Sequence, residues 1–305
     1  MVTQEIMKTP LEIVIDSDTG NETDDQFALV YALLAPEAVK IKAVMAAPFL
    51  HYRVNTPAEG MQLSILEIKR ILKLLGREDI PVWEGARQFM TANLQVGSSG
   101  IDTLIEMAEE HSEDDPLVIV SIAALTNVAA ALRSRPDIGR KIVLVWLGSH
   151  SYHQSPDEFN LVQDYLAASI VFNSKIRKVI FPCHGVAEKL ALSNTEVEQR
   201  LMPCGALGQF LANRFRRMFN GSLTPESRLP IWDIAPFAWR IIPDAVTMAE
   251  ETARGFCPQT IAWLPGNGLK DLVCQELDRD RIFADFFRRL NQFHRENPDL
   301  KPNDF

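Results

Sequence analysis

The sequence lacks the features by which several classes of protein are recognised. It contains no run of about 18 uncharged apolar residues, so we expect no membrane-spanning helix. Residues 1–10 carry no apolar core of the kind found in secretory leaders. The net charge of −9 argues against sequence-independent binding to nucleic acid phosphates. We therefore expect neither nucleic acids nor membranes as partners.

Cysteine is scarce as well, and the chain contains no internal repeat and no low-complexity tract. The four cysteines do not have the spacing of metal ligands, so we expect reduced thiols and a cytoplasmic location: Cys183, Cys204, Cys257 and Cys274. Hydrophobic residues make up 47% of the chain and charged residues 23%, as in ordinary globular proteins. The 305 residues show no linker, which predicts one domain over residues 1–305.

One stretch near the N-terminus combines an apolar run with four aspartates. The β-branched run 13–15 predicts a short buried strand. Thr23 and Gln26 have the spacing of a capping box, which predicts a helix start at Thr23. The helix that follows is predicted to be amphipathic and to end before Pro36.

The four aspartates of this stretch fall where a ligand site is expected. Asp16 and Asp18 follow the strand, and Asp24 and Asp25 open the helix. Ligands of parallel sheets bind at this edge. Carboxylates crowded there repel one another by several kcal/mol, and a hard cation such as Ca²⁺ or Mg²⁺ removes that repulsion. The simpler interpretation is that two of them are ordinary acids of a helix N-terminus and two are turn residues.

The rest of the chain alternates between buried strands and helices through about residue 185. Strands are predicted at 39–47, 80–83, 117–122, 142–147 and 178–181, and helices at 59–75, 100–110 and 166–172. This order predicts an α/β fold, a doubly wound, mostly parallel sheet with helices on both faces. The C-terminal part is predicted to be mainly helical, with helices at 195–219, 231–241 and 280–295 and late, antiparallel strands at 260–263 and 272–275.

Four motifs in this order resemble the inosine–uridine-preferring nucleoside hydrolase family, and the resemblance extends from residue 11 to about 290. The first motif is the Asp-x-Asp…Asp-Asp cluster described above. The second is the turn 123–129, which is similar to the family's Gly-Pro-Leu-Thr-Asn turn. The third is Glu158-Phe159-Asn160, and the fourth is Asp233 at the start of a helix.

The resemblance implies a metal-dependent hydrolase with a fold of the nucleoside hydrolase type. Its reaction splits the N-glycosidic bond of a ribonucleoside into ribose and a free base. The implied cofactor is Ca²⁺, held by Asp18, Asp25, Asp233 and the main-chain carbonyl of Thr126. Asp18 is implied as the base that activates a metal-bound water. A homodimer or homotetramer is expected.

The resemblance also implies substrate contacts. Asp24 is expected to bind the ribose 2′-hydroxyl, and Glu158 and Asn160 other ribose hydroxyls. Asp16 is expected to orient the metal ligands from behind. Trp232 stands where purine-cleaving members of the family carry a histidine that protonates the departing base.

With Trp232 at this position, the sequence leaves open how the departing base is activated. The base could be activated by stacking on Trp232 or by another donor. Alternatively, the substrate could carry a better leaving group, as p-nitrophenyl riboside does. Four histidines lie at or just beyond predicted strand ends and could reach the pocket: His51, His150, His153 and His184. The loop 19–23 is two residues longer than in common members, and Ala47-Pro48 replaces a Gly-Asn pair.

Two other functions compete with this interpretation. The run 16–20 also fits the opening motif of haloacid-dehalogenase-type phosphohydrolases, with Asp16 as nucleophile and Mg²⁺ as cofactor. That reading leaves Asp24, Asp25 and the 158–160 motif unexplained, and it lacks a later Asp-Asp pair at a strand end. A non-catalytic ribose- or nucleoside-binding protein is the second alternative, and Trp232 in place of the acid is the feature that favours it.

Overall fold

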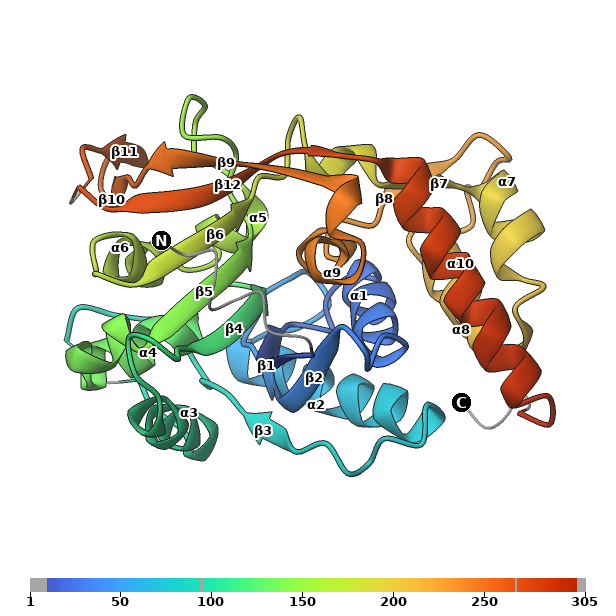
Figure 1. The fold of residues 1–305 in the computed structure, drawn as a ribbon, viewed down its shortest axis with the longest axis horizontal. Helices are drawn as coiled ribbons and strands as arrows, with labels where there is room; N and C mark the ends of the chain where they lie inside the picture. Colours follow the sequence, from blue (N-terminus) through green and yellow to red (C-terminus); the bar gives the residue numbers. More distant parts are fainter. Residues whose placement is uncertain (1–9, 94–95, 267, 301–305) are drawn as a thin grey trace.

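The protein is built around an eight-stranded sheet, described here from a computed structural model that covers residues 10–93, 96–266 and 268–300 (Figure 1). The segment 1–9, where no leader was expected, lies outside the described residues. In sheet order the strands are β3 (Val82–Glu84), β2 (Val39–Ala46), β1 (Leu11–Ser17), β4 (Leu117–Ile122), β5 (Ile142–Leu147), β6 (Arg177–Phe181), β12 (Lys270–Leu277) and β9 (Val246–Thr252). All neighbours pair in parallel except β12 and β9. The predicted α/β fold with a mostly parallel sheet is confirmed.

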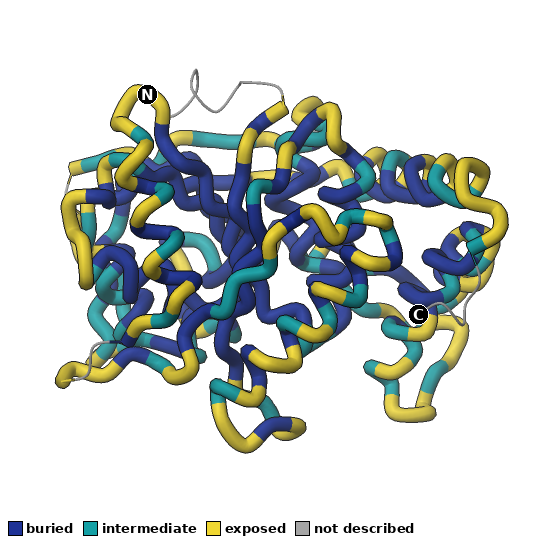
Figure 2. The backbone as a smooth tube through the Cα atoms, turned by 90° about the horizontal axis from the view of Figure 1, so that it is seen from below, coloured by how far each residue is buried: buried dark blue, intermediate teal, exposed yellow. Residues whose placement is uncertain are grey.

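Helices cover both faces of this sheet. The α-helices are α1 (Asp24–Leu33), α2 (Pro57–Leu74), α3 (Ser99–Glu110), α4 (Thr126–Ser134), α5 (Phe159–Val162), α6 (Tyr165–Phe172), α7 (Asn194–Glu196), α8 (Gly205–Arg217), α9 (Ile234–Ile241) and α10 (Arg279–Glu296). Ile13 and Ile15 of β1 join the core formed with α1, α2, α8, α9 and α10. Val14, between them, joins the core formed with α3, α4 and α6. Successive side chains of a strand point to opposite faces, so the central strands are buried on both sides (Figure 2).

Helix α1 differs from its prediction in two respects. Thr23 precedes the helix, but its side chain caps no backbone N–H, and Gln26 instead donates from Nε2 to the carbonyl oxygen of Thr19 at 2.8 Å. The helix is also buried along all ten residues rather than on one face. The reason is tertiary packing: α1 contacts α2, α9 and β2, and the ring of Phe27 lies 5.8 Å from that of Phe286 of α10. The N-terminus of α1 is thereby held inside the protein.

The C-terminal part is less regular than predicted. The helix expected over 195–219 is interrupted by a π-helical turn, Val197–Leu201, and resumes at Gly205, where φ is +67°. Strand β9 was not predicted, because its alternating, partly exposed residues resemble a polar loop. It forms the antiparallel edge of the sheet. Two small antiparallel pairs complete the fold: β7 (Ala191–Ser193) with β8 (Arg228–Pro230), and β10 (Gly255–Cys257) with β11 (Ala262–Leu264).

In the described part of the chain, no helix has both the length and the apolar character needed to cross a membrane.

Candidate active site

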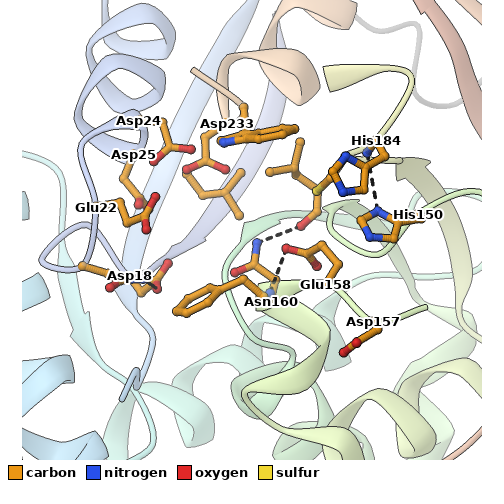
Figure 3. Close-up of a pocket in the computed structure, with 16 residues that line it drawn as sticks. Asp18, Glu22, Asp24, Asp25, His150, Asp157, Glu158, Asn160, His184 and Asp233 are labelled. Atoms are coloured by element: carbon orange, nitrogen blue, oxygen red, sulfur yellow. Dashed lines mark hydrogen bonds between the residues drawn. The ribbon is translucent and has the colours of Figure 1, made fainter. Parts of the chain in front are cut away.

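A cavity of about 310 Å³ opens at the carboxyl edge of the central strands (Figure 3). The loops after β1, β5 and β6 and the N-termini of α1, α5 and α9 all reach it. The lining residues are Asp18, Asn21, Glu22, Asp24, Asp25, Ile122, Leu147, His150, Asp157, Glu158, Phe159, Asn160, Cys183, His184, Trp232 and Asp233. Seven of these sixteen residues carry a carboxyl group and none is lysine or arginine, so the cavity suits a cation together with a polyhydroxylated ligand.

Three carboxylates in this cavity form a compact cluster. Asp24 and Asp25 belong to the first turn of α1, and Asp233 directly precedes α9. All three side chains are buried, and each offers an oxygen within 4.8 Å of the others. At that separation two ionised carboxylates repel by about 3.5 kcal/mol when the effective dielectric constant is about 20. The partial positive charge at the N-termini of α1 and α9 offsets part of this repulsion.

The protonation of the cluster reflects the same repulsion. Burial, followed by the charge of Glu22, raises the pKa of Asp24 to about 7. Burial and neighbouring carboxylates also raise the pKa values of Asp25 and Asp233. The donors are all hard oxygen atoms, which are the ligands that Ca²⁺ and Mg²⁺ prefer. The cluster therefore fits a divalent cation, as was predicted for Asp25 and Asp233.

Asp18 lies at the edge of this cluster. Its carboxylate accepts a hydrogen bond from Asn21 Nδ2 at 3.0 Å, and burial raises the pKa of its carboxyl group. One oxygen of Asp25 accepts a hydrogen bond from Ser17 Oγ at 2.6 Å. In Figure 3 the Asp18 side chain faces the cavity beside Glu22 and Asp25. A carboxylate placed there can act both as a metal ligand and as a base.

Glu158 and Asn160 form the next wall. Glu158 caps the short helix α5: Oε1 accepts from the Asn160 N–H at 2.9 Å and Oε2 from the Ser149 N–H at 2.6 Å. Asn160 donates from Nδ2 to the Leu147 carbonyl at 3.1 Å, which leaves its Oδ1 for a ligand hydroxyl. Ser149 has φ +63°, a conformation that costs a non-glycine residue free energy and is found mainly at functional sites.

Aromatic and imidazole rings line the opposite end. The rings of His150 and His184 lie 4.2 Å apart between centroids, and the edge of His184 meets Trp232 at 6.5 Å. Of the four histidines named from the sequence, these two line the cavity. His51 and His153 are outside the lining, and the side chain of His153 is 77% exposed.

Comparison with known proteins identifies the family to which the chain belongs. The profile described as "Inosine-uridine preferring nucleoside hydrolase" matches residues 13–284. The chain belongs to this family.

Relatives of the nucleoside hydrolase family match over nearly their full length. The chain is 28% identical over 320 residues to the pyrimidine-specific ribonucleoside hydrolase RihA of Enterobacter sp. (strain 638), covering 93% of this chain and 98% of the relative. It is also 28% identical over 321 residues to RihA of Salmonella typhimurium, covering 93% and 99%. Among solved structures, a plant nucleoside hydrolase, PpNRh1, superposes with a TM-score of 0.71 at 20% identity, covering 92% of this chain and 99% of that one. A purine-preferring ribonucleoside hydrolase from Gardnerella vaginalis superposes with a TM-score of 0.70 at 19% identity, covering 92% of this chain and 98% of that one.

Thr126, the residue expected to supply a main-chain ligand, begins helix α4. Thr126 is fully buried and outside the cavity lining, and its hydroxyl donates to Asp164 Oδ2 at 2.9 Å. Ile122, the last residue of β4, lines the cavity. The metal contact expected from the Thr126 carbonyl stays a prediction.

Asp16 is also placed away from the cavity. It is fully buried, accepts Asn127 Nδ2 at 2.8 Å and Ser121 Oγ at 3.1 Å, and is not among the lining residues. Burial raises the pKa of its carboxyl group to about 7. These bonds tie β1 to β4 and to the start of α4. A nucleophile needs access to its substrate, so the phosphohydrolase interpretation loses the residue on which it depended.

Three titratable lining residues were not named as site residues from the sequence. Glu22 lies in the lengthened loop after β1, Asp157 precedes the 158–160 motif, and Cys183 follows β6. The extra loop length was visible in the sequence and marked Glu22 indirectly. Cys183 carried no such signal, because its place in the cavity depends on where β6 ends in the folded sheet.

Proposed function

We propose that this nucleoside hydrolase family member splits the N-glycosidic bond of a ribonucleoside, giving ribose and a free base, with Ca²⁺ as its cofactor. The observation that carries the proposal is the convergence of Asp18, Asp24, Asp25 and Asp233 on one cavity, from segments up to 215 positions apart in the chain (residue 18 to residue 233). Such a set of buried carboxylates is costly without a cation and suits both metal and ribose binding.

The proposed metal ligands are Asp18, Asp25 and Asp233, together with one main-chain carbonyl. We propose the carbonyl of Thr126, at the start of α4, which the family resemblance implied. When bound, the cation lowers the pKa of a coordinated water and anchors ribose hydroxyls. A Ca²⁺ site accepts six to eight oxygen ligands, so substrate and water oxygens complete the set.

The chain's own residues have distinct proposed roles around that site. Asp18 accepts the proton of the attacking water, since its carboxylate faces the cavity at the edge of the cluster. Asp24 binds the ribose 2′-hydroxyl, because three carboxylates already exceed the charge of one divalent cation. Glu158 and Asn160 hold further ribose hydroxyls, and Trp232 packs against the base. Asp16 supports the site from behind through its bonds to β4 and α4.

Two further expectations belong to the same proposal. We propose assembly as a homodimer or homotetramer, which light scattering on the purified protein tests directly. We also propose a cytoplasmic location, with which the four free thiols agree.

A nucleoside panel tests the proposal. Uridine, cytidine, inosine, adenosine and p-nitrophenyl riboside are incubated with the full chain, once with Ca²⁺ and once with a chelator, and the released base is measured by chromatography. The proposal predicts release of at least one base with Ca²⁺ and its loss on chelation. Ca²⁺-dependent binding of ribosides without release would contradict it and would favour the non-catalytic alternative.

A further inference from the structure

The cavity has two chemically different ends. Glu22 and four aspartates crowd one end: Asp18, Asp24, Asp25 and Asp233. His150 and His184 occupy the other end, in the segments that follow β5 and β6, and Asp157 lies on the side of His150 (Figure 3). Glu158 and Asn160 lie between these ends. If the ribose hydroxyls face the carboxylates and the amide, as the proposed function requires, the base attached to C1′ extends toward the imidazoles and Trp232.

His184 is paired with a carboxylate on its own segment. Its Nδ1 lies 3.0 Å from Glu188 Oε2, and the other carboxylate oxygen, Oε1, accepts the Gly185 N–H at 2.7 Å. Gly185 has φ +78°, a conformation that glycine adopts at little cost, and it turns the chain so that both bonds form. With Nδ1 donating to Glu188, Nε2 is the ring nitrogen available to a bound base.

Glu188 places a negative charge beside the His184 ring. The hydrogen bond from His184 is the main cause that lowers the pKa of Glu188, so Glu188 is ionised at neutral pH. A carboxylate at hydrogen-bond distance stabilises the protonated imidazole. The side chain of His184 is 59% exposed, so solvent can return a proton to it after each turnover.

His150 differs from His184 in the hydrogen bond that its Nδ1 makes. Its Nδ1 accepts the backbone N–H of His184 at 3.4 Å, which leaves the ring proton on Nε2. Burial, followed by the charge of His184, lowers the pKa of His150. The two rings lie 4.2 Å apart between centroids, and His184 is the one paired with a carboxylate, that of Glu188.

We propose that His184 is the catalytic acid that protonates the departing base, and that Glu188 is the residue that positions it. The inference rests on the proposed function. As the C1′–N bond breaks, its electron pair passes to the base, and the proton on His184 Nε2 moves to the base, which leaves neutral. Water supplies the oxygen that bonds to C1′, and Asp18 takes its proton. Solvent then returns a proton to His184 and removes one from Asp18.

This assignment explains how the cavity works with Trp232 in place of a histidine. Trp232 offers an aromatic face for the base but no group that protonates it at neutral pH. The His184 ring lies 6.5 Å from the same indole ring between centroids, so a base packed against Trp232 lies within reach of the imidazole.

The test compares substrates that do and do not need an acid. General acid catalysis contributes about 10²–10⁴-fold, whereas p-nitrophenolate leaves without protonation. For His184→Gln we expect kcat on the best nucleoside of the panel to fall at least about 100-fold. The loss on p-nitrophenyl riboside is expected to be at least about tenfold smaller. Added imidazole should restore nucleoside cleavage by His184→Ala, because the ring site is open to solvent.

Glu188 and a control histidine complete the design. Glu188→Gln should lower kcat on the nucleoside with little change in KM, and Glu188→Asp should retain more activity than the amide. His153→Gln removes an exposed histidine that is outside the cavity and serves as the matched control. Independently of turnover, the side-chain ¹⁵N NMR signals of His184 should change in Glu188→Gln and stay unchanged in His153→Gln.

The outcomes separate this inference from the proposed function. Equal losses on both substrates in His184→Gln, or no loss on either, would overturn the assignment while the proposed hydrolase activity stands. Failure of imidazole rescue together with unchanged ¹⁵N signals in Glu188→Gln would overturn it as well. A wild-type protein that cleaves neither substrate would overturn both proposals.

Discussion

Replacing Asp233 by asparagine should stabilise the metal-free protein and reduce the stabilisation that Ca²⁺ adds. The carboxylate lies within 4.8 Å of those of Asp24 and Asp25, so two repulsive pairs of about 3.5 kcal/mol each disappear with it. The ceiling of the gain is therefore about 7 kcal/mol in the metal-free protein. Proton uptake by Asp24, whose pKa is raised to about 7, already relieves part of the repulsion. We expect a measured gain of about 2–4 kcal/mol at pH 7.5.

With Ca²⁺ present, the same substitution should reduce the metal's effect. At a hundredfold excess over Kd, a ligand that binds only the folded state adds about 2.7 kcal/mol. For a chain of 305 residues this corresponds to a rise of about 4 °C in Tm. Asp233→Asn removes a charged ligand and should show a clearly smaller rise.

The assay is thermal unfolding at pH 7.5 in a chelator and in millimolar Ca²⁺. Glu106→Gln, which removes one exposed acid on α3, is the matched control for net charge and should follow the wild type in both buffers. A metal-free Asp233→Asn protein that is less stable than wild type would refute the repulsion argument. An unchanged Ca²⁺ increment in the variant would refute Asp233 as a ligand.

Two further predictions concern residues behind the site. The pKa of Asp16 is about 7 in the folded protein, against an ordinary 3.8. Its contribution to the free energy of unfolding is therefore fully present below pH 3.8, and about 4 kcal/mol is lost as the pH rises to above 7. Asp16→Asn should therefore flatten the fall in unfolding free energy between pH 5 and 8 in Ca²⁺-saturated protein, and an equally steep fall would show that other groups cause it. A Cβ on Gly148 would lie 2.2 Å from the fully buried Trp146 ring. Gly148→Ala should therefore lower the free energy of unfolding, measured in urea, by about 1–3 kcal/mol. A cost below about 0.5 kcal/mol would mean that the ring relaxes.

The central strands could be predicted because their signal is local. The runs that form β4 and β5 are apolar apart from Ser121, and their observed ends coincide with the predicted ones. Burial on both faces of a parallel sheet produces this pattern in the sequence itself. Strand β9 pairs only at the sheet edge and alternates weakly, so its assignment depends on β12, far along the chain.

The side chains of the site could be predicted only in part. The aspartates of the first loop stand out in the sequence as acids at a strand end and a helix start, whereas Asp233 was named through the family resemblance. The carbonyl of Thr126 was named in the same way, and its role stays a prediction. The pairing of His184 with Glu188 depends on the positive φ of Gly185, which the sequence suggests but does not specify.

The most direct test of the central claim is ¹H NMR of a ribonucleoside during incubation with the Ca²⁺-loaded protein in phosphate-free buffer. The account predicts that the anomeric proton signal of the nucleoside is replaced by those of α- and β-ribose, in step with the free base. Asp18→Asn should abolish most of this conversion, because it removes a ligand charge and the proposed base, while Glu106→Gln should convert at the wild-type rate. Unchanged nucleoside with the wild-type protein, or equal rates in wild type and Asp18→Asn, would contradict the account.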